Sequence, residues 1–171
     1  MLSAAVLVPT SEAQAALNAY LKLKGQKVGE IKGSVTQKGR EGAIKVIAVS
    51  HEIVAPRDPA SGLPTGKRQH KPFVFTLEID RSTPQLLGAL AGNEKLPAVV
   101  FEMGGGKDGA ALYKINLINA SIASFEYVTL DDSNTAAIRL TLTYQKIEWQ
   151  WVPEGITGAD DWESPVVKKS L

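Results

Sequence analysis

The chain has 171 residues, of which 44% are hydrophobic, which is enough for one domain with a real core and excludes global disorder. Its 19 basic and 18 acidic side chains leave a net charge of +1, so no bulk field draws it to nucleic acid or to an anionic membrane. It contains no cysteine, which excludes disulfides, thiolate metal sites and a cysteine nucleophile, and no apolar run approaches the roughly 18 residues needed to span a bilayer.

The first fifteen residues differ from the rest and are predicted to be an extension that precedes a single domain at residues 16–171. Ala13-Gln14-Ala15 resembles a signal-peptidase site. However, the apolar run Ala4–Val8 is short, and no Lys or Arg precedes it. A start-site extension or a tail outside the core therefore fits these residues better than a secretory signal.

Most of the chain alternates between apolar and polar residues with a period of two, which predicts strands with one face in the core. The first strand places Leu17, Ala19, Leu21 and Leu23 on one face. Residues 43–54 are rich in β-branched side chains, but their alternation is blurred. We therefore expect this strand to be buried on both faces.

An eighteen-residue segment, Ala55–Pro72, separates this strand from the next and contains four prolines and two glycines. Loops of this length are uncommon in compact domains and are usually functional or disordered. Proline fixes φ and lacks a backbone donor, so the segment cannot join the middle of a sheet and is too stiff for a flexible linker. The composition predicts a polar arm that projects from the domain and reaches for something else.

Lys67, Arg68, His70 and Lys71 form a basic cluster within this segment. A solvated loop tip is the simplest interpretation. Nucleic-acid binding is weakly supported, because the cluster is short, the chain is nearly neutral and no aromatic residues are interleaved. A contact with acidic groups of a neighbouring subunit is the sharper alternative, for which Asp58 and Asp80 are examples of suitable partners.

The alternation resumes over residues 73–80 and then gives way to a helical period. Ser82-Thr83-Pro84-Gln85 supplies a capping hydroxyl, an early-turn proline and a glutamine three residues on. Leucines follow at helical spacing, and Gly92 ends the pattern. The sequence predicts one short helix, Thr83–Ala91, that packs a leucine stripe onto a sheet.

Four further strands are predicted at residues 98–103, 112–119, 121–130 and 137–151, with a hairpin loop at 104–109 and a turn at 131–134. In the last strand the apolar positions are even up to Tyr144 and odd from Ile147. A one-residue slip turns later side chains to the other face, which predicts a β-bulge or sharp bend at Gln145–Lys146. The predicted fold is therefore mainly β: a small β-barrel or two-sheet sandwich with one short flanking helix and one long extended loop.

The chain carries no complete motif for catalysis or for cofactor binding. Gly104-Gly105-Gly106-Lys107 lacks the Walker spacing, since Phe101 stands where a glycine is required. The two histidines, His51 and His70, have no metal-ligand spacing and no accompanying nucleophile. The pairs Asp131-Asp132 and Asp160-Asp161 fit turns and caps, or in the second case an anchor for a tail with Trp162 buried. We expect no catalytic residue, metal or cofactor, and no enzymatic activity.

Five blocks occur in order along residues 17–165: KGSVTQKGREG, HEIVAPRDPASGLPTGKRQHKP, EIDRSTPQLLGAL, YQKIEWQW and GADDWESP. Together they resemble the haemolysin-coregulated protein (Hcp) family, the tube proteins of type VI secretion. The resemblance implies a β-barrel with a flanking helix, assembled as a homo-hexameric ring with a wide channel. Rings would stack into a tube that a contractile sheath expels with a spike at its tip, and the channel would carry and stabilise secreted effectors.

The resemblance also implies assembly in the bacterial cytoplasm followed by secretion, without membrane insertion and without nucleic acid as a partner. In such a ring the extended loop would reach a neighbouring or stacked subunit. The residues predicted at this interface are Arg57, Asp58, Pro59, Lys67, Arg68, His70, Glu78 and Asp80, the last two helping to dock the arm. Residues 1–15 and the glycine-rich loop at 104–109 depart from the family pattern, and that loop could affect stacking or cargo.

Two other functions are alternatives. A monomeric β-barrel could use the basic loop to bind nucleic acid or an acidic protein. A hydrolase would require a fused toxin domain, for which the sequence after the predicted barrel leaves no room.

Overall fold

The computed structural model describes residues 18–105, 109–131 and 134–162. In these ranges the chain forms eleven strands and one helix. In chain order they are β1 (Ala19–Gly25), β2 (Gly29–Ile31), β3 (Ile44–Ser50), β4 (Ile53–Val54), β5 (Gln69–His70), β6 (Phe73–Glu78), α1 (Thr83–Ala91), β7 (Lys95–Met103), β8 (Tyr113–Leu130), β9 (Thr135–Thr143), β10 (Lys146–Trp151) and β11 (Ile156–Asp161). The predicted extension and parts of the predicted loops at 104–109 and 131–134 lie outside the described residues.

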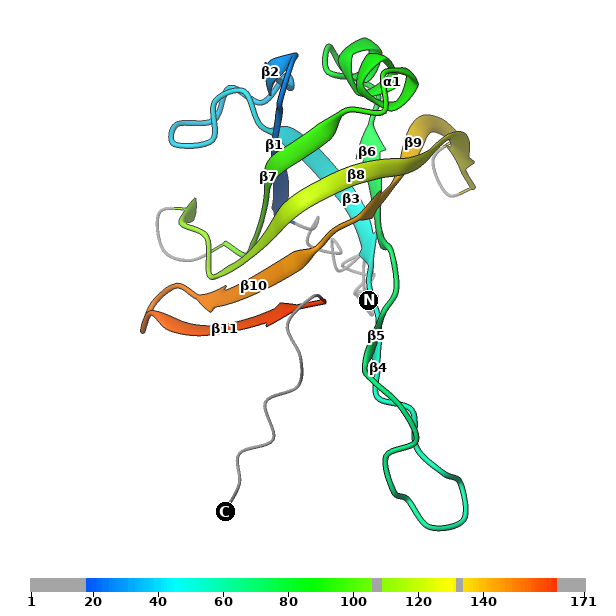
Figure 1. Cartoon of the computed structure of the whole chain (residues 1–171). Coiled ribbons are helices and arrows are strands. Elements are labelled where there is room, and N and C mark those ends of the chain that lie inside the picture. The colour runs from blue at the N-terminus through cyan, green and yellow to red at the C-terminus, as the bar shows by residue number, and fades with distance from the viewer. Residues whose placement is uncertain (1–17, 106–108, 132–133, 163–171) are drawn as a thin grey trace, which may run out of the picture.

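Six antiparallel strands close into a barrel in the order β8-β7-β1-β3-β6-β9, because β8 also pairs with β9. The length of β8, 18 residues, makes this closure possible. Its first half pairs with β10 and its second half with β9, so β10 and β11 continue the sheet beyond the barrel (Figure 1). The mainly β fold is confirmed, and the alternative of barrel or sandwich is resolved as a closed barrel.

Alternate residues of the barrel strands fill one core, as the period-two pattern predicts. Phe73, Phe75 and Phe101 meet at its centre, with ring centroids 4.7 Å apart for the first two and 5.1 Å for the last two. Aromatic contacts of this kind add to the free energy gained from burial alone.

The prediction that residues 43–54 are buried on both faces is wrong. Ile44 and Val46 are buried, whereas Lys45 and Ala48 are exposed. The register with β6 shifts between Val46 and Ala48. A bulge at this point moves the later apolar residues across the strand, which explains why the alternation in the sequence is blurred.

Helix α1 has the predicted bounds and buries Leu86 and Ala89 against the sheet, at the end of the barrel opposite β4 and β5 (Figure 1). Its start differs from the prediction, because the Ser82 side chain makes no capping bond to the helix. Instead Asp80 accepts hydrogen bonds from the backbone N–H and the hydroxyl of Ser82, and its own N–H donates to the Thr83 hydroxyl.

The face change in the last predicted strand is confirmed, with a break between β9 and β10 at Tyr144 and Gln145. Leu142 is buried before the break and Ile147 after it. On the paired strand β8, Asn119 has a positive φ of 52°, so both strands bend here. β8 is nevertheless continuous, where the sequence predicted two strands.

Strand β11 was not predicted. Its sequence, ITGADD, carries a glycine and two aspartates, which are depleted in strands. It forms by pairing along the whole length of β10.

Candidate subunit interface

The proline-rich segment forms an ordered hairpin that projects away from the barrel (Figure 1). β4 and β5 pair at its base, and an isolated bridge joins Arg57 to Pro64 further out. We call residues 53–70 the arm. Because two antiparallel pairings hold it and its prolines restrict the backbone, the arm is a stiff element.

Hydrogen bonds close the outer turn of the arm on itself. One carboxylate oxygen of Asp58 accepts from the N–H groups of Ala60 and Ser61, at 3.1 and 2.7 Å, and from the Ser61 hydroxyl. These bonds, led by the Ser61 N–H, hold the pKa of Asp58 below its usual value. Arg57 donates to the carbonyl of Gly62 at 3.0 Å. The turn therefore needs no contact with the barrel to keep its shape.

Side chains near the tip are open to solvent. Leu63 is 65% exposed, and Pro59 and Lys67 are also exposed. Single exposed hydrophobic side chains are common on protein surfaces, so it is the position of Leu63 on a stiff projecting hairpin, and not its exposure alone, that makes it a candidate contact. No residue of the arm between positions 53 and 69 belongs to the buried core.

The base of the arm is fastened to the C-terminal strand β11. Arg68 donates through Nε to the Asp160 carboxylate and through Nη2 to the Asp161 carbonyl, at 2.9 Å for the latter. His70, whose side chain is 1% exposed, places Nε2 2.6 Å from the same Asp160 carboxylate. Burial acts to raise the pKa of Asp160, but the bonds and charges of Arg68 and His70 outweigh it and lower the pKa below its usual range.

The same base is fastened to the barrel through the bend between β9 and β10. The hydroxyl of Tyr144 lies 2.8 Å from Nδ1 of His70 and 2.7 Å from Nε2 of His51. Burial first, and the charge of Asp160 second, raise the pKa of Tyr144, so its hydroxyl stays protonated. Burial and then the charge of His70 lower the pKa of His51, which also stacks on Phe73. We call Arg68, His70, Tyr144 and Asp160 the anchor.

The predicted interface residues thus fall into three places. Arg57, Asp58, Pro59 and Lys67 lie on the projecting part of the arm, and Arg68 and His70 lie in the anchor.

Glu78 and Asp80 lie on the barrel, away from their own arm. Glu78 is paired with Lys45 at 2.9 Å, and Asp80 accepts from the N–H of Ser34 at 2.8 Å. A contact of these two groups with the arm of another copy stays a prediction.

Sequence reasoning missed the anchor as a unit. Asp160 was singled out only as half of an acidic pair, although the idea that it anchors the C-terminal segment was correct. Trp162 was expected to be buried there, but it is 44% exposed, with its ring 4.9 Å from that of His70. The face change at Tyr144 was the one signal in the sequence that this side chain leaves the regular strand.

The anchor engages part of the basic cluster at Lys67, Arg68, His70 and Lys71. Two of its four members, Arg68 and His70, already contact a carboxylate of the same chain. This leaves Lys67 and Lys71 exposed, which is a poor footprint for nucleic acid.

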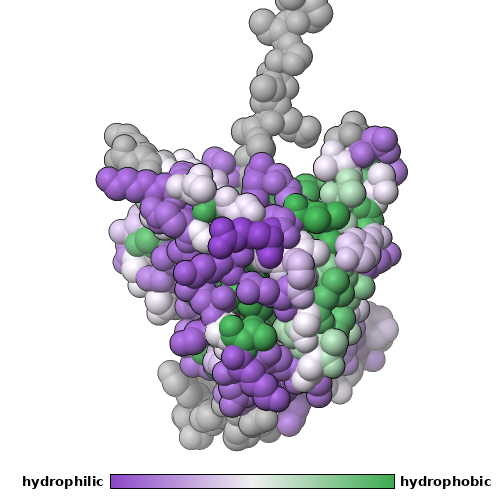
Figure 2. Space-filling view, turned by 90° about the horizontal axis from the view of Figure 1, so that it is seen from above, coloured by the Kyte–Doolittle hydropathy of each residue, from purple (hydrophilic) through white to green (hydrophobic). Residues whose placement is uncertain are grey.

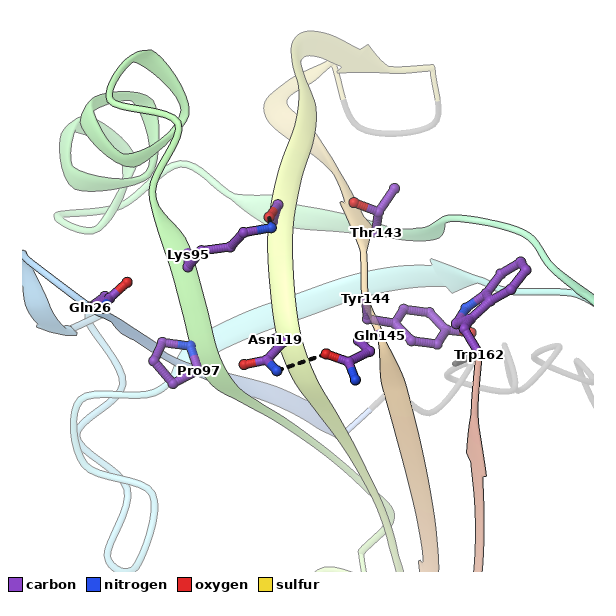
Figure 3. A pocket seen from close by; sticks show the side chains of 9 residues that line it. Gln26, Lys95, Pro97, Asn119, Thr143, Tyr144, Gln145 and Trp162 are labelled. Atoms are coloured by element: carbon purple, nitrogen blue, oxygen red, sulfur yellow. Dashed lines mark hydrogen bonds between the residues drawn. The ribbon is translucent and has the colours of Figure 1, made fainter. Parts of the chain in front are cut away.

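A groove of about 550 Å³ lies beside the anchor (Figure 3). Tyr144 and Trp162 lie next to each other at one end, and Asn119 donates to the Gln145 side chain across the floor at 2.9 Å. Its described lining is amide, hydroxyl, ammonium and aromatic, without a carboxylate or histidine.

The described residues contain neither a metal-ligand cluster nor a membrane-spanning helix. No three His, Cys, Asp or Glu side chains are grouped so that they could hold a metal ion. No helix in this part of the chain has the length and apolarity needed to cross a membrane.

Comparison with known proteins places these features in a family. A family model described as type VI secretion system effector, Hcp, matches residues 20–151. The major exported protein of Pseudomonas aeruginosa is 34% identical over 166 residues, which cover 86% of this chain and 96% of that protein. The chain belongs to the Hcp family, the tube proteins of type VI secretion.

Solved Hcp structures share the fold. A crystal structure of an Hcp protein superposes with a TM-score of 0.77 at 30% identity, covering 84% of this chain and 98% of the other. A mutant form of Hcp1 from E. coli EAEC 042 gives 0.76 at 33% identity, with 84% and 97% covered. The secreted protein Hcp3 from Pseudomonas aeruginosa gives 0.69 at 28% identity, with 84% and 99% covered. The resemblance noted in the sequence is therefore confirmed as family membership.

Proposed function

We propose that this chain is the subunit of hexameric rings that stack into the type VI secretion tube, without catalysis of its own. The rings assemble in the bacterial cytoplasm, sheath and spike proteins of the machine act on the tube, and the channel carries effectors out of the cell. The observation that carries the proposal is the arm, an ordered hairpin that leaves its own barrel and exposes Leu63 near its tip.

The two ends of the barrel differ, which suits head-to-tail stacking. The arm leaves one end (Figure 1). The α1 end is largely hydrophilic, with a band of hydrophobic residues along one side (Figure 2). A contact between unlike surfaces repeats without limit along an axis, and the same kind of contact closes into a ring when its rotation permits.

Within this proposal the arm meets a second copy through Arg57, Asp58, Pro59 and Lys67. Glu78 and Asp80 receive the arm on the other copy. Arg68 and His70 serve the contact indirectly, because they hold the base of the arm in place. A stable contact of this kind buries roughly 800 Å² on each partner.

Electron microscopy and light scattering of the purified chain test the proposal. The parent should form rings of six and stacked tubes. A variant in which residues 56–67 are replaced by Asn-Gly keeps Ala55 and Arg68 in register, because a two-residue turn closes an antiparallel pair. This variant should stay folded by circular dichroism and lose the assemblies. A parent that is monomeric at micromolar concentration would contradict the ring, and unchanged tubes after shortening would contradict the role of the arm.

A further inference from the structure

The hydroxyl of Tyr144 lies between two imidazole rings at the two ends of the arm, one just before it begins and one at its last residue. His51 precedes β4 and His70 lies in β5, at 2.7 and 2.8 Å from the same oxygen. A phenol has one proton to donate and lone pairs that accept. The hydroxyl can therefore donate to only one of the two rings and must accept from the other.

The hydrogen bonds are all satisfied when both rings are neutral. Nε2 of His70 carries its proton toward Asp160, so its Nδ1 accepts from Tyr144, and Tyr144 accepts from Nε2 of His51. One added proton on His70 reverses this order. His70 then donates to Tyr144, and Tyr144 donates to a neutral His51.

A second added proton leaves the hydrogen bonds of this group unsatisfied. If His51 is charged as well, both rings donate to one oxygen and the hydroxyl proton loses its acceptor. Two positive rings then share one neighbour, and like charges in a partly buried site repel. Burial and the charge of His70 lower the pKa of His51, which agrees with the conclusion that a second proton is disfavoured.

The other charged groups around the pair do not compensate for the second proton. Asp160 of β11 faces His70 and is already bound by Arg68, the residue before β5. Asp161 of β11 interacts electrostatically with Arg68 and with Lys146 at the start of β10. The ring of His51 faces Phe73 and Tyr144, and the charged group that displaces its pKa is His70 and not a carboxylate.

We propose that His51 and the anchor together form a proton-controlled latch: it fixes the direction of the arm while His51 is neutral and releases the arm when His51 and His70 are both charged. The latch lies within one chain and does not depend on ring assembly. It gives the tube subunit a means by which acidification frees the arm without unfolding the barrel.

Spin labels measure the direction of the arm directly, because the chain has no native cysteine. Thr65→Cys on the arm and Thr129→Cys on β8 are both at exposed positions. The labelled chain is diluted into unlabelled protein, and the distance distribution is recorded at about pH 7.5 and about pH 5, on either side of the ordinary histidine pKa of about 6.5. The distribution should be narrow at the higher pH and about twofold broader at the lower, as for a segment released to move independently.

Two further variants separate the latch from general loosening. Tyr144→Phe removes the hydroxyl that joins the rings, so its distance distribution should be broad at both pH values. His51→Phe keeps an aromatic ring on Phe73 but cannot take up the second proton, so its distance distribution should stay narrow at both pH values. Three results would overturn the latch. These are a parent distance distribution of equal width at both pH values, a narrow distribution for Tyr144→Phe, and a distribution for His51→Phe that broadens at low pH like that of the parent.

Two measurements on the same samples keep the outcomes apart. Circular dichroism confirms that each variant remains folded at both pH values. Light scattering reports assembly separately, so a monomeric chain with a narrow distribution at neutral pH would contradict the ring and leave the latch standing.

Discussion

At the scale of single residues, a buried carboxylate fixes the turn between β1 and β2. Glu94 is 7% exposed and accepts from the backbone N–H groups of Lys27 and Val28, at 2.5 and 2.8 Å. Glu94→Ala leaves both donors without this charged acceptor and should lower the free energy of unfolding by about 2 kcal/mol. Urea unfolding checks this value. Glu154→Ala, at an exposed position, serves as the control and should change it by less than about 0.5 kcal/mol.

His51 predicts how stability depends on pH. Burial, and then the charge of His70, lower its pKa in the folded chain, whereas the unfolded chain titrates near the usual 6.5. Between the two values the unfolded state binds more protons, so the stability that His51 contributes is complete above about pH 6.5 and is lost as the pH falls below it. His51→Phe should remove this part of the slope. Urea midpoints of the parent and the variant from about pH 7.5 to pH 5 test it, and parallel curves would contradict the assignment.

At the scale of elements, helix α1 contains a glycine that lowers its stability. Gly88 lies inside the helix, and a Cβ placed on it meets no atom within 4 Å. Gly88→Ala should therefore raise the free energy of unfolding by about 1 kcal/mol, since alanine loses less backbone entropy in a helix. Thermal unfolding measures the change.

Gly33→Ala is the matched substitution with the opposite expected sign. Its Cβ would lie 2.3 Å from the Ala43 carbonyl oxygen, so the backbone must shift. We expect a loss of about 1–3 kcal/mol, as for overpacking elsewhere. Equal effects of the two alanines would show that space at the Cβ does not control these positions.

The elements also show what local pattern can predict. The helix at Thr83–Ala91 and the face change near Tyr144 were predictable, because each depends on residues close together in sequence. β11 was not, because ITGADD has no strand propensity and forms by pairing with β10. The anchor was missed for the same reason: His70 and Asp160 are 90 residues apart in the sequence and meet only in the folded chain.

At the scale of the whole molecule, the barrel and the arm are separate in their energetics. The core holds no residue of the arm between positions 53 and 69, and the outer turn is held by its own hydrogen bonds. The barrel therefore does not need the projecting part of the arm for its stability. Conversely, the nearly balanced charge of the chain leaves no strong repulsion between copies that pack closely.

A substitution at Leu63 should affect assembly without affecting the stability of the barrel. Leu63 is 65% exposed in the single chain, and burying most of a leucine against another copy contributes about 1–2 kcal/mol. Leu63→Ser should leave the melting temperature of the monomer unchanged. It should raise the concentration at which half of the chains assemble by roughly 5- to 30-fold for each arm contact, because 1.4 kcal/mol corresponds to tenfold. Light scattering over a dilution series measures this concentration.

Ile156→Ser is the matched control, since Ile156 is 60% exposed on β11 rather than on the arm. Ile156→Ser should raise the concentration of half-assembly far less than Leu63→Ser does, because the proposed contact uses the tip of the arm. Equal shifts for the two serines would mean that assembly depends on exposed apolar area in general. An assembly curve unchanged by Leu63→Ser would mean that Leu63 stays in solvent in the ring, and the arm would then have to act through the other proposed contacts, Arg57, Asp58, Pro59 and Lys67.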